Sequence, residues 1–161
     1  MELQLNLVTP IQLTRSKKII IDKNNIPECI PESYGVYFIS RKHGKKYTPI
    51  YIGETSNLNN RLKDHLNNAE ICDVLRGNYE GDKEIRQGTR FFHYGEFVAK
   101  QGQRAAKCIS IIQKHMIEQA VEAGIPILNK NLTKVRSNII YSNGTSDGRG
   151  WFPKKSIVKA K

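Results

Sequence analysis

The sequence predicts a single small domain with an α/β fold of the α+β kind. Two neighbouring segments rich in aromatic and β-branched residues favour an antiparallel hairpin. Two other segments repeat apolar residues every three or four positions, as amphipathic helices do. The chain has 161 residues, of which 39% are hydrophobic, and this length and composition suit one core.

Segments 34–40 (YGVYFIS) and 47–53 (YTPIYIG) are the two strands of the expected hairpin, joined by a polar turn that contains glycine. Pro49 belongs near the start or at an exposed edge of its strand because proline has no N–H to donate. Segment 89–97 favours a third strand, and segment 18–22 favours another strand within the first thirty residues.

Two helices are expected after these strands. The first covers about 58–66, where leucine recurs every fourth residue behind three N-capping candidates at 55–57. The second runs from about 102 to 123, since Gly124 suits a left-handed helix end and Pro126 prevents continuation.

The remaining segments have weaker patterns. Segment 67–87 is irregular and is expected to hold a short helix and a long loop. Residues 142–150 are rich in Ser, Gly and Asn, which favours a mobile loop. The last nine residues, PKKSIVKAK, contain four lysines and no acid, which indicates a short basic tail.

The charge of the chain is strongly positive. It has 26 Lys and Arg residues against 15 Asp and Glu residues, a formal net charge of +11 at pH 7, and a pI near 9.7. Self-repulsion of this size is usually tolerated where a polyanion is the partner, so nucleic acid is the leading candidate, although lysine-rich ends also serve as solvated termini. Lys83, Arg86 and Arg90 are expected either along a DNA backbone or on a solvated surface.

Membrane, secreted and cysteine-based functions are disfavoured. No stretch approaches the roughly 20 apolar residues that cross a bilayer, and the start lacks the basic and apolar regions of a signal peptide. Cys29, Cys72 and Cys108 lie far apart and form no C-x-x-C pair for zinc or dithiol chemistry. We therefore expect a cytoplasmic protein with no membrane partner.

Four polar side chains lie on the expected elements: Tyr37 and Tyr51 on the paired strands, Arg61 on the shorter helix and Glu118 on the longer one. The helix that follows Gly53 offers free N–H groups and a dipole to a phosphate. Each side chain alone has an ordinary structural interpretation, because strand tyrosines usually pack and helix Arg and Glu residues usually pair with neighbours. A functional interpretation therefore depends on the whole set.

The order and spacing of these residues resemble the signature of the GIY-YIG nuclease superfamily. The matching residues are Gly35-Val36-Tyr37, Tyr51-Ile52-Gly53, Asn57-Leu58, Arg61, Glu118 and Pro126-Ile127-Leu128-Asn129. The resemblance implies a three-stranded antiparallel sheet flanked by helices. We expect a nuclease domain at 31–133, an N-terminal extension at 1–30, and a C-terminal loop and basic tail at 134–161.

The resemblance also implies metal-dependent hydrolysis of a nucleic-acid phosphodiester, usually in DNA. Tyr37 matches a tyrosine that acts as general base or positions water, and Tyr51 matches one near the scissile phosphate. His65 matches a position that shares in proton transfer or phosphate contact. A free tyrosine with a pKa of about 10 is ionised only about one part in a thousand at pH 7, so Tyr37 acts as a base only if a nearby cation lowers its pKa.

The resemblance assigns the other matched residues to the phosphate, the metal ion and the polar groups around them. Arg61 matches the cation that neutralises the phosphate, Glu118 the single carboxylate that binds a divalent metal, and Asn129 a member of the supporting polar shell. One carboxylate is a sparse ligand set, which suits Mg²⁺ (or Mn²⁺) because such an ion keeps several waters. Glu54 departs from the family pattern directly after the YIG tripeptide, and its role is left open.

The leading hypothesis is a metal-dependent endonuclease that cleaves double-stranded DNA, of a restriction-like or phage type. The alternatives are a catalytically inactive nucleic-acid-binding protein on the same scaffold and a repair-type nuclease that nicks DNA. Because one active site cuts one strand, we also expect a homo-oligomer with contacts from apolar stretches such as 19–21 and 139–141. Those stretches are equally suited to covering the sheet of their own subunit.

Overall fold

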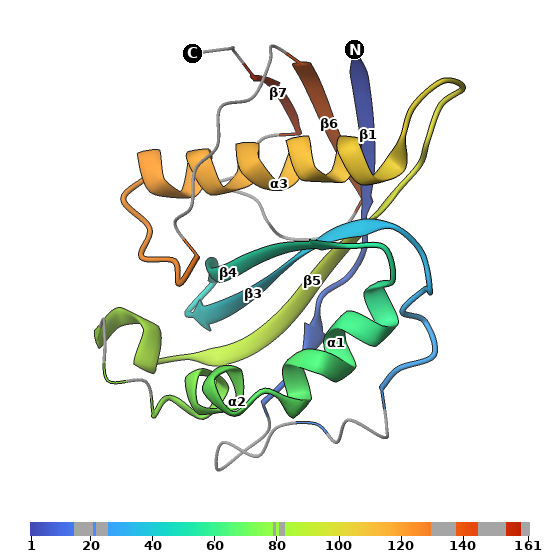
Figure 1. The fold of residues 1–161 in the computed structure, drawn as a ribbon. Helices are drawn as coiled ribbons and strands as arrows, with labels where there is room; N and C mark the ends of the chain where they lie inside the picture. Colours follow the sequence, from blue (N-terminus) through green and yellow to red (C-terminus); the bar gives the residue numbers. More distant parts are fainter. Residues whose placement is uncertain are drawn as a thin grey trace.

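A computed structural model of the chain describes residues 1–14, 21, 26–78, 80, 83–129, 138–144 and 154–158. The expected fold class is confirmed, because one curled and mainly antiparallel sheet is flanked by three α-helices within these residues (Figure 1). None of the helices in this described part combines the length and the apolar character that a membrane crossing requires.

The sheet takes strands from both ends of the described chain as well as from its middle. They are β1 Glu2–Leu7, β2 Ile11–Gln12, β3 Gly35–His43, β4 Lys46–Thr55, β5 Thr89–Phe97, β6 Asn138–Gly144 and β7 Lys155–Val158. Their order across the sheet is β4-β3-β5-β1-β6-β7, and β2 pairs with β5. β1 and β6 run parallel, whereas the other pairs are antiparallel. Strand β4 therefore forms one edge of the sheet.

The helices are α1 Leu58–Asn67, α2 Ala69–Arg76, the 3₁₀-helix η2 Lys83–Arg86 and α3 Ala105–Glu122. The side chain of Asn57 caps α1 by accepting a hydrogen bond from the backbone N–H of Asn60, and Asn68 caps α2 in the same way. α3 begins later than expected because Gly102 takes a left-handed conformation, with φ at 80°, that a helix does not accept.

Side chains along β3 and β4 alternate between two cores, one on each face of the sheet. On one face Val36, Phe38 and Ile52 pack with residues of α3, and on the other face Tyr37 and Ile39 pack with residues of α1 and α2. Figure 1 shows α3 above the sheet and α1 and α2 below it. Side chains from α1 and α3 can therefore meet only where they reach past an edge of the sheet.

The start of the chain belongs to the sheet. β1 lies between β5 and β6, and its Leu3, Leu5 and Leu7 are buried in the core beneath α3. The sheet is therefore larger than the three strands that the family resemblance implied. Of the strand expected at 18–22, only residue 21 is among the described residues, and it lies outside any strand.

The end of the chain also contributes strands. The mobile loop expected at 142–150 is wrong for its first three residues, because they belong to β6, while 145–150 lie outside the described residues. β7 forms from part of the expected basic tail and pairs with β6. The physical reason is that β1 offers β6 a full row of backbone partners, and Ile140 is buried in the core as a result.

The placement of Arg90 also differs from the expectation. Its side chain on β5 is buried, with 1% of its surface exposed, so it lies neither on a solvated surface nor along DNA. The guanidinium donates to four backbone carbonyls, those of Val74, Ile85, Gln87 and Gly88. A buried arginine is tolerated when its donors are satisfied in this way.

Candidate active site

The two tripeptides of the signature face one another across the β3–β4 hairpin. Tyr37 on β3 is paired with Gly53 on β4. A Cβ atom at Gly53 would collide with the phenol ring and hydroxyl of Tyr37, so only glycine lets this ring lie over β4. The tyrosine of the first tripeptide thus requires the glycine of the second.

Gly35 has a second close approach, which positions α1. A Cβ atom there would lie 2.5 Å from the carbonyl oxygen of Gly95 and 2.7 Å from Cδ1 of Leu58, the first residue of α1. The missing side chain lets the start of α1 pack directly onto β3. Helix α1 then carries its inward-facing residues to the tyrosines of the hairpin.

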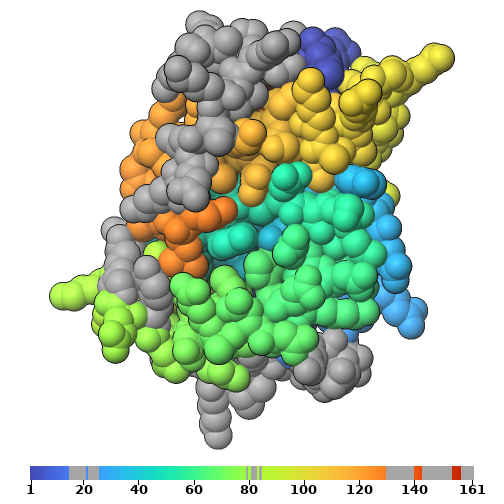
Figure 2. Space-filling model, viewed as in Figure 1, coloured from blue at the N-terminus to red at the C-terminus, as the bar shows by residue number. Residues whose placement is uncertain are grey.

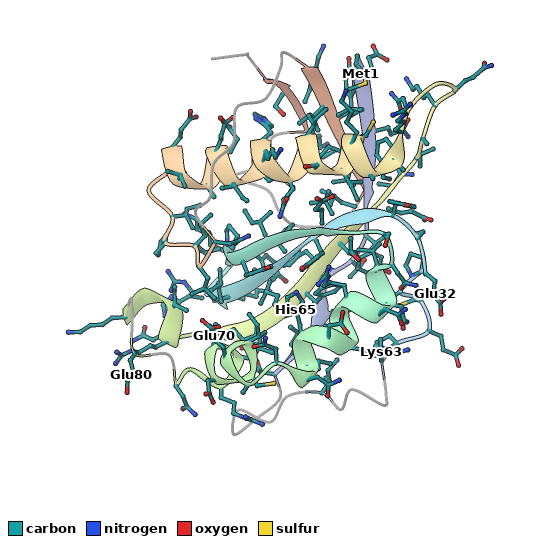
Figure 3. The ribbon with its side chains drawn as sticks, in the orientation of Figure 1. Met1, Glu32, Lys63, His65, Glu70 and Glu80 are labelled. Atoms are coloured by element: carbon teal, nitrogen blue, oxygen red, sulfur yellow. The ribbon has the colours of Figure 1, made fainter. Side chains whose placement is uncertain are left out.

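Tyr37, Tyr51 and His65 form one contact cluster between the hairpin and α1. The Tyr37 hydroxyl lies 2.7 Å from Nε2 of His65, and both side chains are buried. The Tyr37 and Tyr51 rings stack with centroids 6.2 Å apart, and the Tyr51 ring meets His65 edge-on at 5.2 Å. Figure 3 shows His65 on the side of α1 that faces the sheet, with Lys63 on the other side.

Both partners of the Tyr37–His65 hydrogen bond are neutral near pH 7. Burial raises the pKa of the Tyr37 phenol, with a further contribution from Tyr51, and the nearby Arg61 charge only partly opposes this. Burial and the charge of Arg61 together lower the pKa of His65 to about 4. The hydrogen bond therefore joins a neutral phenol and a neutral imidazole, and the tautomer of His65 sets which of the two donates. The depressed tyrosine pKa that a base requires is absent from this arrangement of the described residues.

Arg61 extends from α1 beside this cluster. Its Nε is buried and has no hydrogen-bond partner among the described residues. The structure also records no ion pair between Arg61 and Asp64, the acidic residue three positions further along α1, within that part of the chain. A buried N–H of a cation without an acceptor is costly, and an anionic ligand would satisfy it.

Glu54 lies where the two faces of the sheet meet at edge strand β4. Burial raises the pKa of its carboxyl, while the positive charges of Lys114 and Arg61 oppose the increase. Lys114 belongs to α3 and Arg61 to α1, so one carboxylate lies under the influence of a cation from each face. In Figure 2 the surface of β3 and β4 is visible between α3 and the pair α1 and α2. The carboxylate whose role the sequence left open thus feels the positive charges of Lys114 and, to a smaller extent, Arg61.

Asn129 completes the free edge of β4. Its Oδ1 accepts from the backbone N–H of Ile52 at 3.1 Å, and its Nδ2 donates to the backbone carbonyl of the same residue. Gln113 of α3 also donates to that carbonyl, at 3.2 Å, and the N–H of Leu128 donates to the carbonyl of Ile50 at 2.8 Å. The amide of Asn129 therefore acts as a backbone substitute that supports the strand carrying Tyr51.

Glu118 extends from α3, on the other face of the sheet from α1. Its Oε2 lies 4.0 Å from Nδ1 of His115, and 19% of its side chain is exposed. No group of three or more His, Cys, Asp or Glu side chains suited to a metal occurs in the described part of the chain. A single, partly exposed carboxylate fits a magnesium-like ion that keeps most of its waters, and it does not fit a zinc cage.

The structure thus brings together Tyr37, Tyr51, Arg61 and His65, and it places Asn129 on the adjoining strand edge and Glu118 on α3. Sequence reasoning missed Gln113 and Lys114, which act at the same edge. Both are half-buried polar residues directly after the buried Ile112, and this position on an amphipathic helix is the signal that could have found them.

Comparison with known proteins agrees with this geometry. A family model described as the GIY-YIG catalytic domain matches residues 33–115, about half of the chain. The matched region contains the hairpin, α1, α2 and β5, and it ends before Glu118 and Asn129. No curated protein and no solved structure matches the chain.

Proposed function

Because the chain belongs to the GIY-YIG nuclease superfamily, we propose that it is a metal-dependent endonuclease that hydrolyses phosphodiester bonds of double-stranded DNA. Family membership makes its general activity that of a nuclease-type hydrolase. The observation that carries the finer proposal is the buried Nε of Arg61, which lacks an acceptor among the described residues and lies beside the Tyr37–His65 pair.

Arg61 would receive the scissile phosphate. A guanidinium offers planar, paired donors that match two phosphate oxygens, and negative charge grows on those oxygens in the transition state. Glu54 would keep the guanidinium of Arg61 oriented in the absence of substrate, since its carboxylate lies within the influence of that charge. Tyr51, which stacks on Tyr37 and meets His65 edge-on, would line the same position.

Tyr37 and His65 would handle the proton of the attacking water. In the His65 tautomer whose Nε2 is unprotonated, the Tyr37 hydroxyl would donate to that nitrogen, 2.7 Å away, and its lone pairs would be free to accept a hydrogen bond from water. Water transfers a proton to the Tyr37 oxygen while the original tyrosine proton passes to His65. A phosphate that neutralises Arg61 removes one of the two causes that lower the pKa of His65, so substrate binding makes this histidine a better base.

Glu118 would hold the divalent ion, Mg²⁺ or Mn²⁺, through its partly exposed carboxylate. When bound, such an ion supplies positive charge that stabilises the phosphodiester transition state. The carboxylate would also limit how close the anionic substrate comes without the ion, because like charges repel.

A supercoiled-plasmid assay tests this proposal. We expect cleavage with Mg²⁺ or Mn²⁺, none with EDTA, and none by Glu118→Ala, which should keep its fold and its DNA affinity. The matched control is Glu122→Ala, which removes an exposed carboxylate one turn further along α3 and should cut normally. Normal cleavage by Glu118→Ala would refute the metal role. Binding without cleavage by the wild-type chain with either ion would favour the inactive-scaffold alternative.

The restriction-like or phage-type role is the finer part of the proposal. Sequencing the ends of cleaved DNA would reveal whether a site is recognised, and a product that remains nicked would favour the repair-type alternative. Light scattering of the chain, alone and with a short duplex, tests the expected homo-oligomer.

A further inference from the structure

The hairpin arm, defined as residues 41–46 between β3 and β4, carries a dense group of cations. Its sequence is Arg-Lys-His-Gly-Lys-Lys, and the chain has no acidic residue from position 41 to position 53. His43, Lys45 and Lys46 are exposed. Like charges placed together on a surface repel one another unless a polyanion covers them.

This arm is an ordered extension of the site strands. The ladder between β3 and β4 continues to its last pair, His43 with Lys46, and Gly44 closes the turn with φ at 62°. The Lys42 ammonium lies 3.2 Å from the Tyr47 hydroxyl and 4.8 Å from the centre of its ring. Because Tyr47 is buried, the core holds the base of the arm in place.

The outer lysines of the arm are not neutralised by the protein. Neither Lys45 nor Lys46 makes an ion pair within the residues that the structure describes. Residues 80–86, which include η2, have three acidic and two basic side chains and thus a formal charge of −1, so they add no net positive charge to this end of the sheet.

The length of β4 fixes how far the arm lies from the site. Lys46 is five residues before Tyr51 on the same strand, which corresponds to about 17 Å at roughly 3.4 Å per residue. Figure 1 shows this turn at the opposite end of β4 from α1. A DNA strand carries one phosphate per roughly 3.4 Å of helix axis, so a duplex aligned with β4 would place the arm about five base pairs from a phosphate bound beside Tyr51.

We propose that the hairpin arm binds the backbone of duplex DNA about half a helical turn from the cleaved bond. This inference rests on the proposed function, because it takes Arg61 and the tyrosines as the second contact on the same duplex. The arm would set the side of the cut on which the enzyme needs intact duplex.

Binding of duplexes of increasing length, from about 4 to about 20 base pairs and each closed by a loop at one end so that the short ones stay paired, tests this inference by fluorescence anisotropy in EDTA over a series of salt concentrations. The test variant is Lys45→Ala/Lys46→Ala, and the matched control is Lys63→Ala/Arg76→Ala, which removes the same charge from exposed positions on α1 and α2. Lys45→Arg/Lys46→Arg keeps the charge and should behave as wild type.

On long duplexes we expect the test variant to bind roughly tenfold more weakly, with the slope of log K against log salt reduced by about 1.8, since each phosphate contact contributes about 0.9. On the shortest duplex of about 4 base pairs, whose three steps cover only about 10 Å and so cannot span both contacts, the test variant should match wild type.

Equal losses of DNA affinity in the test and control variants would overturn the inference. A test variant that loses affinity only for RNA duplexes would also overturn it, and so would a wild-type chain that binds no duplex. Plasmid cleavage is a separate readout. If the plasmid is cleaved but the test variant binds DNA as wild type does, the inference about the arm alone is refuted. If DNA binding depends on the arm but the plasmid is not cleaved, the nuclease proposal alone is refuted.

Discussion

Two arginines in this protein have opposite surroundings. Arg90 on β5 is 1% exposed, and its guanidinium donates to four backbone carbonyls between α2 and β5. Arg61 on α1 has a buried Nε that meets no acceptor among the described residues. The guanidinium of Arg90 thus has all its donors hydrogen-bonded. The guanidinium of Arg61 keeps one donor without an acceptor in the described residues, beside two tyrosines and a histidine.

The difference separates an arginine that stabilises the fold from one that is prepared for a ligand. Burial and the nearby Arg41 lower the pKa of Arg90 to about 10, which still leaves it protonated at neutral pH. Its guanidinium donors are satisfied by backbone carbonyl oxygens where η2 leads into β5. A polar group left unsatisfied in a native structure costs stability, and the cost is recovered only when an anion binds.

Arg90→Ala is the largest expected disruption, and it acts on stability. We expect a loss of about 3–5 kcal/mol in the free energy of unfolding, because four backbone carbonyls each lose a hydrogen-bond donor and a large buried side chain leaves a void. The exposed Arg76→Ala is the control and should change stability by less than about 0.5 kcal/mol. Chemical denaturation measures both, and a similar small effect for the two variants would contradict the structural role of Arg90.

Arg61→Lys is expected to act on the reaction instead. Lysine keeps the charge but lacks the planar set of donors, so kcat should fall about 100-fold or more while the unfolding free energy stays within about 0.5 kcal/mol. Steady-state cleavage measures the rate, with Arg76→Lys as the control. Retention of most of the wild-type kcat would show that the guanidinium geometry is not required.

The part of the site that lies close together in the sequence could be predicted from it. Tyr37, Tyr51, Arg61 and His65 lie within 29 consecutive positions, on a hairpin and the helix that follows it. Hairpin pairing and leucine periodicity are short-range signals, so these elements and their order were accessible. The alternation of Leu3, Leu5 and Leu7 is also a period-two signal, and it could have predicted β1.

The rest depends on segments that are distant in sequence. The pairing of β1 with β6 joins residues more than 130 positions apart, and no local pattern specifies that register. The burial of Arg90 depends on carbonyls of α2 and η2 converging on β5. The influence of Lys114 and Arg61 on Glu54 likewise requires that α3 and α1 both reach the edge at β4.

Asn129→Ala extends the comparison to a polar side chain that, like that of Arg90, is hydrogen-bonded to the protein backbone. Its amide makes two hydrogen bonds to the backbone of Ile52, so we expect a stability loss of about 1–2 kcal/mol. Gln113→Ala is the control and should cost less, because Asn129 still donates to the same carbonyl. A drop in kcat as large as that of Arg61→Lys, at unchanged stability, would instead assign Asn129 a direct role in the reaction.

The smallest expected effect is a shift in the pH dependence of cleavage, and it tests whether Arg61 binds the phosphate of the substrate. In the free enzyme, burial and the Arg61 charge hold the pKa of His65 at about 4, with Asp64 opposing them. A bound phosphate cancels the Arg61 charge, so the pKa of His65 should rise in the complex. The acid limb of kcat, which reports the complex, should then lie about one pH unit above that of kcat/KM, which reports the free enzyme.

Two variants test the cause of this difference between the acid limbs of kcat and kcat/KM. Arg61→Gln removes the cation from both the free enzyme and the complex, so it should make the difference smaller. His43→Gln, at an exposed position, should leave the difference unchanged. Coincident acid limbs in the wild-type enzyme would mean that the open guanidinium of Arg61 does not receive the phosphate.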